Sequence, residues 1–473
     1  MNRSQENRKI HFIGIGGIGV SALAKYYLAQ GFEVSGSDAA ESEILEELRK
    51  AGVKIPHPNP FLTKEREKKE FVDLMIYSAA VREDDPELVE ARARGIKCQT
   101  YSQALGELTK KYFTIAISGT HGKSTTTAMI GLILEAAGLD PAVIIGTKVK
   151  WASGEFSNYR NGKSKYLVIE ADEYAASFLN YWPKIIVLTN IEEDHLDFYT
   201  GGLTQIIETF AEYAGHLGKD GMLVANEEDK NISKIKNQKS KLQFKIQNFN
   251  AGVTIKGLKL QIPGQHNLAN AAAAITVARL LKISDEISVK TLNNFTGTWR
   301  RMEYKGEING AKIYDDYGHH PTEIKATLQG AKELLFERPN SCGGVENFST
   351  SPRHSSGLRS KNKIGRLWCV FQPHQYQRTY QLFEQFVGAF GDADKIIILP
   401  IYNVAGREKE EIKRKVNSEM LTERIKVKNK NVIYLGSFEL AEKYLKEELK
   451  TDDICLIMGA GDIYKLTERL IKK

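Results

Sequence analysis

The sequence contains few cysteines and no long apolar run. Its four cysteines lie far apart without the spacing of metal ligands, which favours reduced thiols over a disulfide framework or a zinc site. No stretch approaches the roughly 18 uninterrupted apolar residues of a membrane helix. The polar segment MNRSQENRKI at the amino terminus has no signal-peptide core. We therefore expect a cytoplasmic protein that does not bind a membrane.

The excess of positive over negative charge is also small. The chain has 66 Lys and Arg residues against 59 Asp and Glu residues, and its lysines are scattered, often beside glutamates. This pattern is typical of a solvated surface and does not indicate a nucleic-acid partner. A length of 473 residues, with 42% apolar and 26% charged residues, predicts a globular protein of roughly three domains.

Strand-like and helix-like segments alternate in three blocks, which predicts an α/β protein with parallel sheets. The first block, 1–108, begins with strand, glycine turn, helix and strand, and further strands are expected at 71–80 and 97–101. The second block, 109–298, repeats this order, with strands at 165–173 and 183–195. It also has a lysine-rich excursion of short strands at 230–260 and an alanine-rich helix over about 267–281. The third block, 299–473, predicts a small doubly wound domain, and its serine-rich stretch 340–360 predicts a mobile loop.

A glycine turn follows the first expected strand. The pattern Gly14-x-Gly16-x-x-Gly19 begins a helix, and Asp38 closes the next strand. Such glycines let the backbone approach a diphosphate at the helix start, and an acid at this place can bind ribose hydroxyls. The pattern suits NAD or any nucleotide diphosphate, although the glycines could instead serve only helix–strand packing.

The segment SGTHGKS at 118–124 predicts a second phosphate-binding loop. It lies between an apolar strand and a helix, so its backbone N–H groups can cradle phosphates. Lys123 can reach the terminal phosphates and the Ser124 hydroxyl can bind Mg²⁺. Ile117 departs from the strict pattern, which has a glycine there. The residues expected to hold the ATP phosphates are Gly119, Thr120, His121, Gly122, Lys123, Ser124 and Thr125.

Acidic residues and a histidine close the two strands expected at 165–173 and 183–195. These residues are Glu170, Asp172, Glu173, Glu192, Asp194 and His195. Because ligands of open α/β sheets bind off the carboxyl ends of strands, these side chains can lie near an ATP-bound Mg²⁺. The alternative is that they cap helices.

Four further groups of polar residues are candidate site residues. His266, Asn267 and Asn270 begin the alanine-rich helix, where Asn can pair with an adenine edge or simply cap the helix. Arg300 and Arg301 could reach a transferring phosphoryl group or form a surface pair. The remaining two groups, DDYGHHP at 315–321 and FQPH at 371–374 with Arg378 beyond it, follow strands and would be costly in a core without partners.

Together these residues resemble the Mur ligases of peptidoglycan synthesis. The resemblance covers nearly the whole chain and is carried by HFIGIGGIGVSALA, SGTHGKSTTT, EADEYAASFL, TNIEEDHLDFY, GQHNLANAAAA, RRMEYKG, DDYGHHPTE, FQPHQYQRT and GAGD. It implies three α/β domains. These are a Rossmann-like UDP-sugar domain (1–108), a P-loop ATP domain (109–298) and a small doubly wound amino-acid-binding domain (299–473).

The resemblance also implies roles for individual residues. The implied catalytic residues are Lys123, Glu170, His195, Arg301 (the cross-domain cation) and Asp316. The implied metal ligands are Ser124, Glu170 and His195. The further residues implied to bind ATP, outside the phosphate loop, are His266, Asn267, Asn270 and Arg301. The implied UDP-sugar residues are Gly14, Gly16, Gly17, Gly19, Asp38, Ser78 and Ala79. The implied amino-acid site comprises Tyr317, His319, His374 and Arg378.

The implied activity is ATP- and Mg²⁺-dependent joining of L-alanine to the lactyl carboxylate of UDP-N-acetylmuramate through an acyl phosphate. The implied enzyme is a cytoplasmic monomer or weak homodimer without nucleic-acid or membrane partners. One alternative is a recycling ligase that adds a whole tripeptide, which EADEY favours slightly, whereas DDYGHHPTE and FQPH favour the alanine enzyme. Others are an NAD-dependent dehydrogenase, which leaves the second loop unexplained, and a non-catalytic nucleotide-binding module.

Three features depart from the family pattern. Gln375 stands where some members carry arginine. No lysine occurs from Ile185 to Gly218, so the carbamylated lysine of other Mur ligases is absent, as the resemblance to the alanine enzyme also implies. The serine-rich stretch 340–360 has no counterpart.

Overall fold

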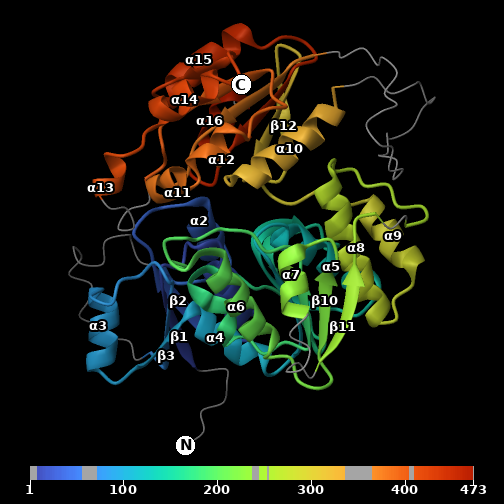
Figure 1. The fold of residues 1–473 in the computed structure, drawn as a ribbon. Coiled ribbons are helices and arrows are strands. Elements are labelled where there is room, and N and C mark those ends of the chain that lie inside the picture. The colour runs from blue at the N-terminus through green and yellow to red at the C-terminus, as the bar shows by residue number, and fades with distance from the viewer. Residues whose placement is uncertain are drawn as a thin grey trace, which may run out of the picture. The chain divides into compact units, whose positions relative to one another are not determined.

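The computed structural model describes residues 8–55, 72–236, 244–252, 255–335, 365–403 and 410–471 (Figure 1). The chain divides into two compact units. Unit 1 comprises 1–191, 207–249 and 273–287, and unit 2 comprises 192–206, 250–272 and 288–473. The predicted mobile loop at 340–360 lies outside the described residues. No helix in the described ranges is long and apolar enough to cross a bilayer.

The first sheet belongs to unit 1, and all its strands are parallel, in the order β2-β1-β3-β4. Its strands are β1 (Lys9–Ile13), β2 (Glu33–Ser37), β3 (Leu74–Tyr77) and β4 (Lys97–Thr100). Its helices are α1 (Ile18–Ala29), α2 (Glu43–Lys50), α3 (Pro86–Ala93) and α4 (Tyr101–Thr109). The strand–turn–helix–strand opening and the strands expected at 71–80 and 97–101 are confirmed with tighter bounds.

The second sheet also belongs to unit 1 and has the order β11-β10-β9-β5-β8-β6-β7. Its strands are β5 (Phe113–Ser118), β6 (Ala142–Lys150), β7 (Phe156–Arg160), β8 (Tyr166–Glu170), β9 (Ile185–Leu188), β10 (Met222–Asn226) and β11 (Lys245–Phe249). The antiparallel hairpin β6–β7 was not predicted, whereas β8 and β9 confirm the strands expected at 165–173 and 183–195.

The helices that follow in the chain are α5 (Lys123–Ala136), η3 (Tyr174–Asn180), α6 (Gly202–Ala214), α7 (Lys230–Lys236), α8 (Gln265–Leu280) and α9 (Asp285–Asn293). The prediction of short strands across 230–260 was wrong for its first part. Residues 230–236 form α7, which buries Ile232 and Ile235 while Lys230 and Lys234 stay exposed. The alanine-rich helix is confirmed as α8.

The third sheet belongs to unit 2 and has the order β12-β13-β17-β14-β15-β16. Its strands are β12 (Glu303–Ile308), β13 (Ala311–Asp316), β14 (Leu367–Phe371), β15 (Lys395–Ile398), β16 (Val432–Tyr434) and β17 (Ile454–Met458). Its helices are α10 (Pro321–Glu333), α11 (Tyr376–Gln381), α12 (Phe383–Val387), α13 (Glu410–Lys413), α14 (Ser418–Lys426), α15 (Phe438–Glu448) and α16 (Tyr464–Ile471). The doubly wound prediction is confirmed, apart from the unpredicted antiparallel edge strand β12.

Both faces of this third sheet are buried. Successive side chains of β14 point to opposite faces, so Cys369 and Phe371 pack in one core while Trp368 and Val370 pack in the other. Cys455 on β17 is buried as well, and burial raises the pKa of both cysteine thiols. Two of the four cysteines are therefore core residues, as expected for reduced thiols.

Candidate active site

The predicted sugar-nucleotide residues meet at the carboxyl ends of β1, β2 and β3. Gly14 has φ +74°, and a Cβ there would lie 3.0 Å from the Cβ of Ser78. The N–H of Gly16 donates to Oδ2 of Asp38 at 2.8 Å, and a Cβ on Gly16 would lie 2.9 Å from the same oxygen and displace it. Gly17 is the exposed residue before α1, and a Cβ on Gly19 would lie 3.0 Å from Oη of Tyr101. The turn therefore favours glycine at Gly14, Gly16 and Gly19, whereas a side chain at Gly17 would meet only ordinary contacts.

Ala79 is exposed and follows Ser78, whose Oγ accepts a hydrogen bond from the N–H of Ala80 at 3.2 Å. The first turn of α1 contains no acidic residue. A helix start of this kind attracts anions, because its N–H groups and the helix dipole both favour negative charge. The arrangement can accept a diphosphate.

The second loop is held by residues that sequence reasoning missed. Gly119 has φ +128°, and a Cβ there would lie 2.2 Å from Oγ1 of Thr189. Asn190 accepts from the N–H of Thr120 through its carbonyl at 3.0 Å and from the N–H of His121 through Oδ1 at 2.9 Å. Thr189 and Asn190 directly follow β9. The residues at the end of β9 therefore hold the loop that follows β5.

Lys123 begins α5 and points back into this loop. Its Nζ donates to Oε2 of Glu173 at 2.7 Å and to the carbonyl of Gly119 at 2.8 Å. Burial opposes the charge of the ammonium, but Glu173 and Asp172 raise its pKa above the ordinary value. Lys123 is therefore a charged group held in place by Glu173, a partner that the sequence patterns did not assign.

Ser124 and Glu170 lie together beside the loop. The Ser124 hydroxyl lies 2.9 and 3.0 Å from the two carboxylate oxygens of Glu170, and Oε2 also accepts from the N–H of Gly146 at 2.9 Å. Burial raises the pKa of the Glu170 carboxyl, although Lys123 opposes the shift. These are hard oxygen donors of the type that Mg²⁺ prefers, so two of the three predicted metal ligands fit a magnesium ion.

The predicted adenine residues gather at the start of α8 in unit 2. Asn267 and Asn270 are buried, whereas His266 is exposed. The amide of Asn267 donates to the carbonyl of Pro263 at 2.7 Å and accepts weakly from Asn270 at 3.4 Å. The structure therefore brings the three residues together, and their contact with adenine stays a prediction.

The two neighbouring arginines have different surroundings. Arg300 is 4% exposed, donates to the carbonyls of Gly459 and Gly461 at 2.7 and 3.3 Å, and lies 3.3 Å from Asp315. Arg301 is partly exposed; it donates to Glu323 at 3.0 Å and lies over the ring of Tyr317.

Asp316, at the end of β13, is also held by hydrogen bonds. Its carboxylate accepts from the N–H groups of Met302 and Gly318. Burial raises the pKa of Asp316, and Arg301 opposes this shift.

The four residues predicted for the amino acid form one cluster. The ring of His319 meets the rings of Tyr317 and His374 at centroid distances of 5.5 and 5.8 Å. His374 stacks on Tyr402, which the sequence patterns did not single out, and its Nδ1 lies 3.4 Å from Arg378. Burial, with the positive charge of Arg378, lowers the pKa of His319 to about 4. This imidazole is therefore neutral at pH 7.

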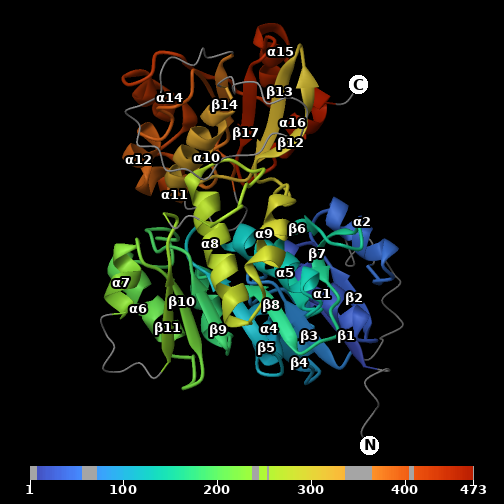
Figure 2. The same cartoon turned by 90° about the vertical axis from the view of Figure 1, so that its right-hand side faces the viewer.

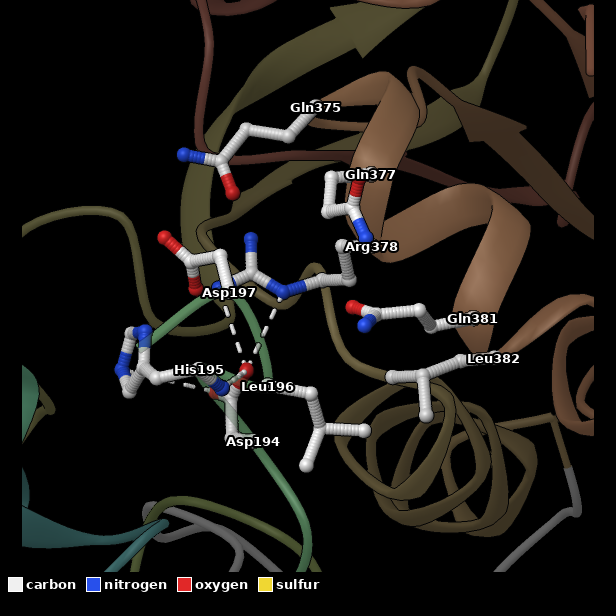
Figure 3. Close-up of a pocket in the computed structure, with 9 residues that line it drawn as sticks. All are labelled: Asp194, His195, Leu196, Asp197, Gln375, Gln377, Arg378, Gln381 and Leu382. Carbon is white, nitrogen blue, oxygen red and sulfur yellow. Dashed lines mark hydrogen bonds and ion pairs between the residues drawn. The ribbon is translucent and has the colours of Figure 1, made fainter. Parts of the chain in front are cut away.

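A small pocket in unit 2 brings Arg378 and His195 to one place (Figure 3). Nε and Nη2 of Arg378 lie 3.2 and 3.1 Å from Oδ1 of Asp194, and the same oxygen accepts from the N–H of His195 at 2.7 Å. Burial opposes ionisation of Asp194, but the Arg378 cation holds its pKa well below the ordinary range. The positive charge of Arg378 is thus balanced within the protein. The pocket is lined by Asp194, His195, Leu196, Asp197, Gln375, Gln377, Arg378, Gln381 and Leu382.

These features together indicate the general class of the protein. A glycine turn on the first sheet, a lysine-bearing phosphate loop on the second and a third α/β sheet with buried ionic residues are those of a multidomain nucleotide-binding enzyme. Three family models match the chain in the same order. They are described as Mur ligase family, catalytic domain (residues 9–113), Mur ligase middle domain (117–252), and Mur ligase, glutamate ligase domain (300–341 and 355–461).

The chain belongs to the Mur ligase family and is a ligase with three α/β domains, as predicted. It is 40% identical to a protein of Clostridium tetani named UDP-N-acetylmuramate–L-alanine ligase, over 98% of both chains. A protein of the same name from Clostridium acetobutylicum is 37% identical over 99% of this chain and 98% of its own. A crystal structure of UDP-N-acetylmuramate-alanine ligase from Thermotoga maritima matches with a TM-score of 0.73 and 26% identity, covering 98% of each chain.

Proposed function

We propose that this enzyme joins L-alanine to the lactyl carboxylate of UDP-N-acetylmuramate, with conversion of ATP to ADP and phosphate. The observation that carries the proposal is the 40% identity, over 98% of both chains, to a ligase named for that reaction. The motifs support it, because every catalytic position that the family pattern requires is filled. The enzyme acts in the cytoplasm, in the synthesis of peptidoglycan precursors, as a monomer or weak homodimer without nucleic-acid or membrane partners.

Each domain has one substrate in this proposal. Residues 1–108 bind the UDP-sugar through the glycine turn, Asp38, Ser78 and Ala79. Residues 109–298 bind ATP through the loop at 119–125 and through the start of α8. Residues 299–473 bind the amino acid. The close packing of the glycine turn and the raised pKa of Lys123 support the first two assignments.

The reaction has two steps. A carboxylate is a poor electrophile, so the lactyl carboxylate first attacks the γ-phosphate and forms an acyl phosphate with release of ADP. The amine of alanine then attacks the acyl carbon and phosphate leaves. Repulsion between the carboxylate and the triphosphate is the main obstacle, and Lys123 and Arg301 neutralise it. Lys123 must exchange part of its contact with Glu173 for phosphate oxygens in this step.

Magnesium fits the residues beside the phosphate loop. Ser124 and Glu170 would hold it together with His195, the third predicted ligand. When bound, the ion supplies positive charge to the β- and γ-phosphates. Its charge would also favour the ionised form of Glu170, whose pKa burial raises.

In the proposed amino-acid site, Arg378 alone would not bind the carboxylate of the amino acid. Asp194 already balances the charge of Arg378, and Gln375, which stands where some members carry arginine, lies in the same pocket. We infer that Arg378 orients groups around the amino acid and that neutral donors contribute to holding its carboxylate. The neutral His319 and the ring of Tyr317 complete this site.

A ligase that adds a whole tripeptide to the same sugar nucleotide is the alternative. A structure titled UDP-N-acetylmuramate:L-alanyl-gamma-D-glutamyl-meso-diaminopimelate ligase, from Neisseria meningitides, matches with a TM-score of 0.54 and 26% identity over 61% of this chain and 98% of its own. The identities of 36–40% to proteins named for alanine, over 98–99% of this chain, favour the alanine enzyme.

A phosphate-release assay separates the two. The purified enzyme is given ATP, Mg²⁺ and UDP-N-acetylmuramate, with L-alanine, L-serine, glycine or the tripeptide as acceptor. We expect phosphate release with L-alanine and little with the tripeptide. Release that requires the tripeptide would replace the proposed function with the alternative.

A further inference from the structure

A polar cluster in unit 1 connects the first sheet to the second. It comprises Ser21, Lys25, Glu47, Lys148 and Asn158, and we call it the α1–β7 junction. Helix α1 lies against the hairpin β6–β7, which is visible in Figure 2. The cluster therefore joins the helix that follows the glycine turn to the sheet that carries the P-loop.

Asn158 on β7 is 1% exposed and uses its whole amide group. Nδ2 donates to the carbonyl of Ile18 at 2.6 Å and to Oγ of Ser21 at 2.8 Å, and Oδ1 accepts from Nζ of Lys25 at 2.9 Å. The Ser21 hydroxyl itself donates to the Ile18 carbonyl. Ile18 is the first residue of α1, so a side chain of the ATP-binding sheet holds the first turn of the sugar-nucleotide helix.

Lys148 on β6 holds the second helix of the first sheet. It is 1% exposed, and its Nζ donates to Oε1 of Glu43 at 2.8 Å and to Oε1 of Glu47 at 2.5 Å. Lys25 donates to the other oxygen of Glu47 at 3.2 Å. A buried lysine is stable as a cation only beside such carboxylates, so this contact fixes the start of α2.

The same strand also contacts the ATP site. The N–H of Gly146 donates to Glu170, the predicted metal ligand, and Lys148 follows two residues later on β6. Helices α1 and α2 follow the glycine turn and Asp38, respectively. Strand β6 therefore has contacts with the elements that bear both predicted nucleotide sites.

We propose that Asn158 and Lys148 are positioning residues for the sugar nucleotide, which fix the glycine turn and Asp38 at a set distance from the P-loop. The inference rests on the proposed function, in which the lactyl carboxylate attacks ATP. Such an attack requires the reacting atoms about 3–3.5 Å apart, and a misplacement of about 1 Å can cost about 100-fold in rate. Neither residue needs to touch a substrate to act in this way.

The test compares Asn158→Leu and Asn158→Asp with wild type. Leucine removes all three hydrogen bonds, while aspartate keeps the shape and the Lys25 contact but loses both donors. We expect KM for UDP-N-acetylmuramate to rise about tenfold and kcat to fall, with KM for ATP within about twofold of wild type. Calorimetric titration with UDP-N-acetylmuramate alone should show the same weakening.

Asn161→Asp is the matched control. Asn161 follows β7, is exposed, and accepts a hydrogen bond from the hydroxyl of Tyr159, which an aspartate also accepts. It should keep wild-type constants. Glu43→Gln provides a gentler variant if the Asn158 variants do not fold, because the Glu43 side chain is 67% exposed and its loss weakens the Lys148 contact. It should raise KM for UDP-N-acetylmuramate alone.

The outcomes separate the inference from the proposed function. Unchanged constants in all the test variants, or equal rises in both KM values with a lower Tm, would overturn the positioning role. Wild-type enzyme that releases no ADP in the presence of UDP-N-acetylmuramate and L-alanine would overturn the proposed function, and this inference with it.

Discussion

At the scale of single residues, three of the predicted site cations each form an ion pair with a carboxylate. Lys123 is held by Glu173, Arg301 by Glu323 and Arg378 by Asp194. In each pair the carboxylate balances the charge of the cation and holds it in place within a partly buried site. A substitution of one member therefore changes both the chemistry and the electrostatic state of the residue left behind.

Lys123→Ala should lower turnover by at least about 10²–10³-fold, because it removes a donor to the transferring phosphoryl group. It should also lower the free energy of unfolding by about 3 kcal/mol, since it deprives the buried Glu173 of its cation. The double variant Lys123→Ala with Glu173→Gln should recover stability and remain inactive. ADP release and urea unfolding measure the two effects, and near-wild-type ADP release from the single variant would contradict the role of Lys123.

His319 should make stability depend on pH. Its pKa is about 4 in the folded protein against 6.5 as the ordinary value, so between these values the unfolded chain binds a proton that the folded chain does not. The stability contributed by this neutral histidine is present above pH 6.5 and declines as the pH falls towards 4. Burial and Arg378 cause the shift, whereas Glu323 and Asp194 oppose it.

The check is urea unfolding of wild type and His319→Asn at a series of pH values. The difference in unfolding free energy between them should change steadily from pH 6.5 down to pH 4 and be constant above pH 7. A difference that does not vary with pH would show that this imidazole does not titrate as the structure indicates.

At the scale of elements, the buried Arg300 connects the ends of neighbouring strands in the third sheet. Arg300 precedes β12, faces Asp315 on β13 and donates to two carbonyls after β17. Its guanidinium also lies over the rings of Tyr317 and Tyr464. These contacts hold the turn that places the adjacent Arg301. Arg300 therefore has a structural role, whereas Arg301 is partly exposed and pairs with Glu323.

Arg300→Met should lower the free energy of unfolding by about 3–5 kcal/mol, because it leaves Asp315 and the carbonyls buried without their donor. Arg279→Met is the control, since Arg279 pairs with Asp285 at a site where both side chains are 50% exposed. That change should cost less than about 1 kcal/mol. Equal effects of the two substitutions in urea unfolding would contradict this account.

At the scale of the whole molecule, the proposed function assigns one ligand to each of three domains. A ligand that binds only the folded chain adds about 2.7 kcal/mol at a hundredfold excess over its Kd. UDP-N-acetylmuramate and Mg²⁺-ATP should therefore each raise Tm by a few degrees, and NAD should not. A rise with NAD and none with the sugar nucleotide, measured by calorimetry, would favour the dehydrogenase alternative over the family assignment.

The sequence by itself determined the three α/β domains and the places of their two glycine-rich turns. Strand, turn and helix in SGTHGKS or in the first glycine turn are adjacent along the chain, so local periodicity and glycine placement reveal them. The hairpin β6–β7, the edge strand β12 and helix α7 were missed. Strands β7 and β12 and helix α7 have only five to seven residues and carry too little periodicity to separate strand from helix.

Only the tertiary structure decided which side chains act together. Glu173 holds Lys123 from 50 residues away, Asp194 holds Arg378 from 184, and Asn158 holds Ile18 from 140. Sequence patterns named both members of the first two pairs without pairing them, and passed over Asn158 entirely. Such partners are chosen by the packing of distant strands and by the cost of leaving a buried polar group unsatisfied, and neither leaves a local signature in the chain.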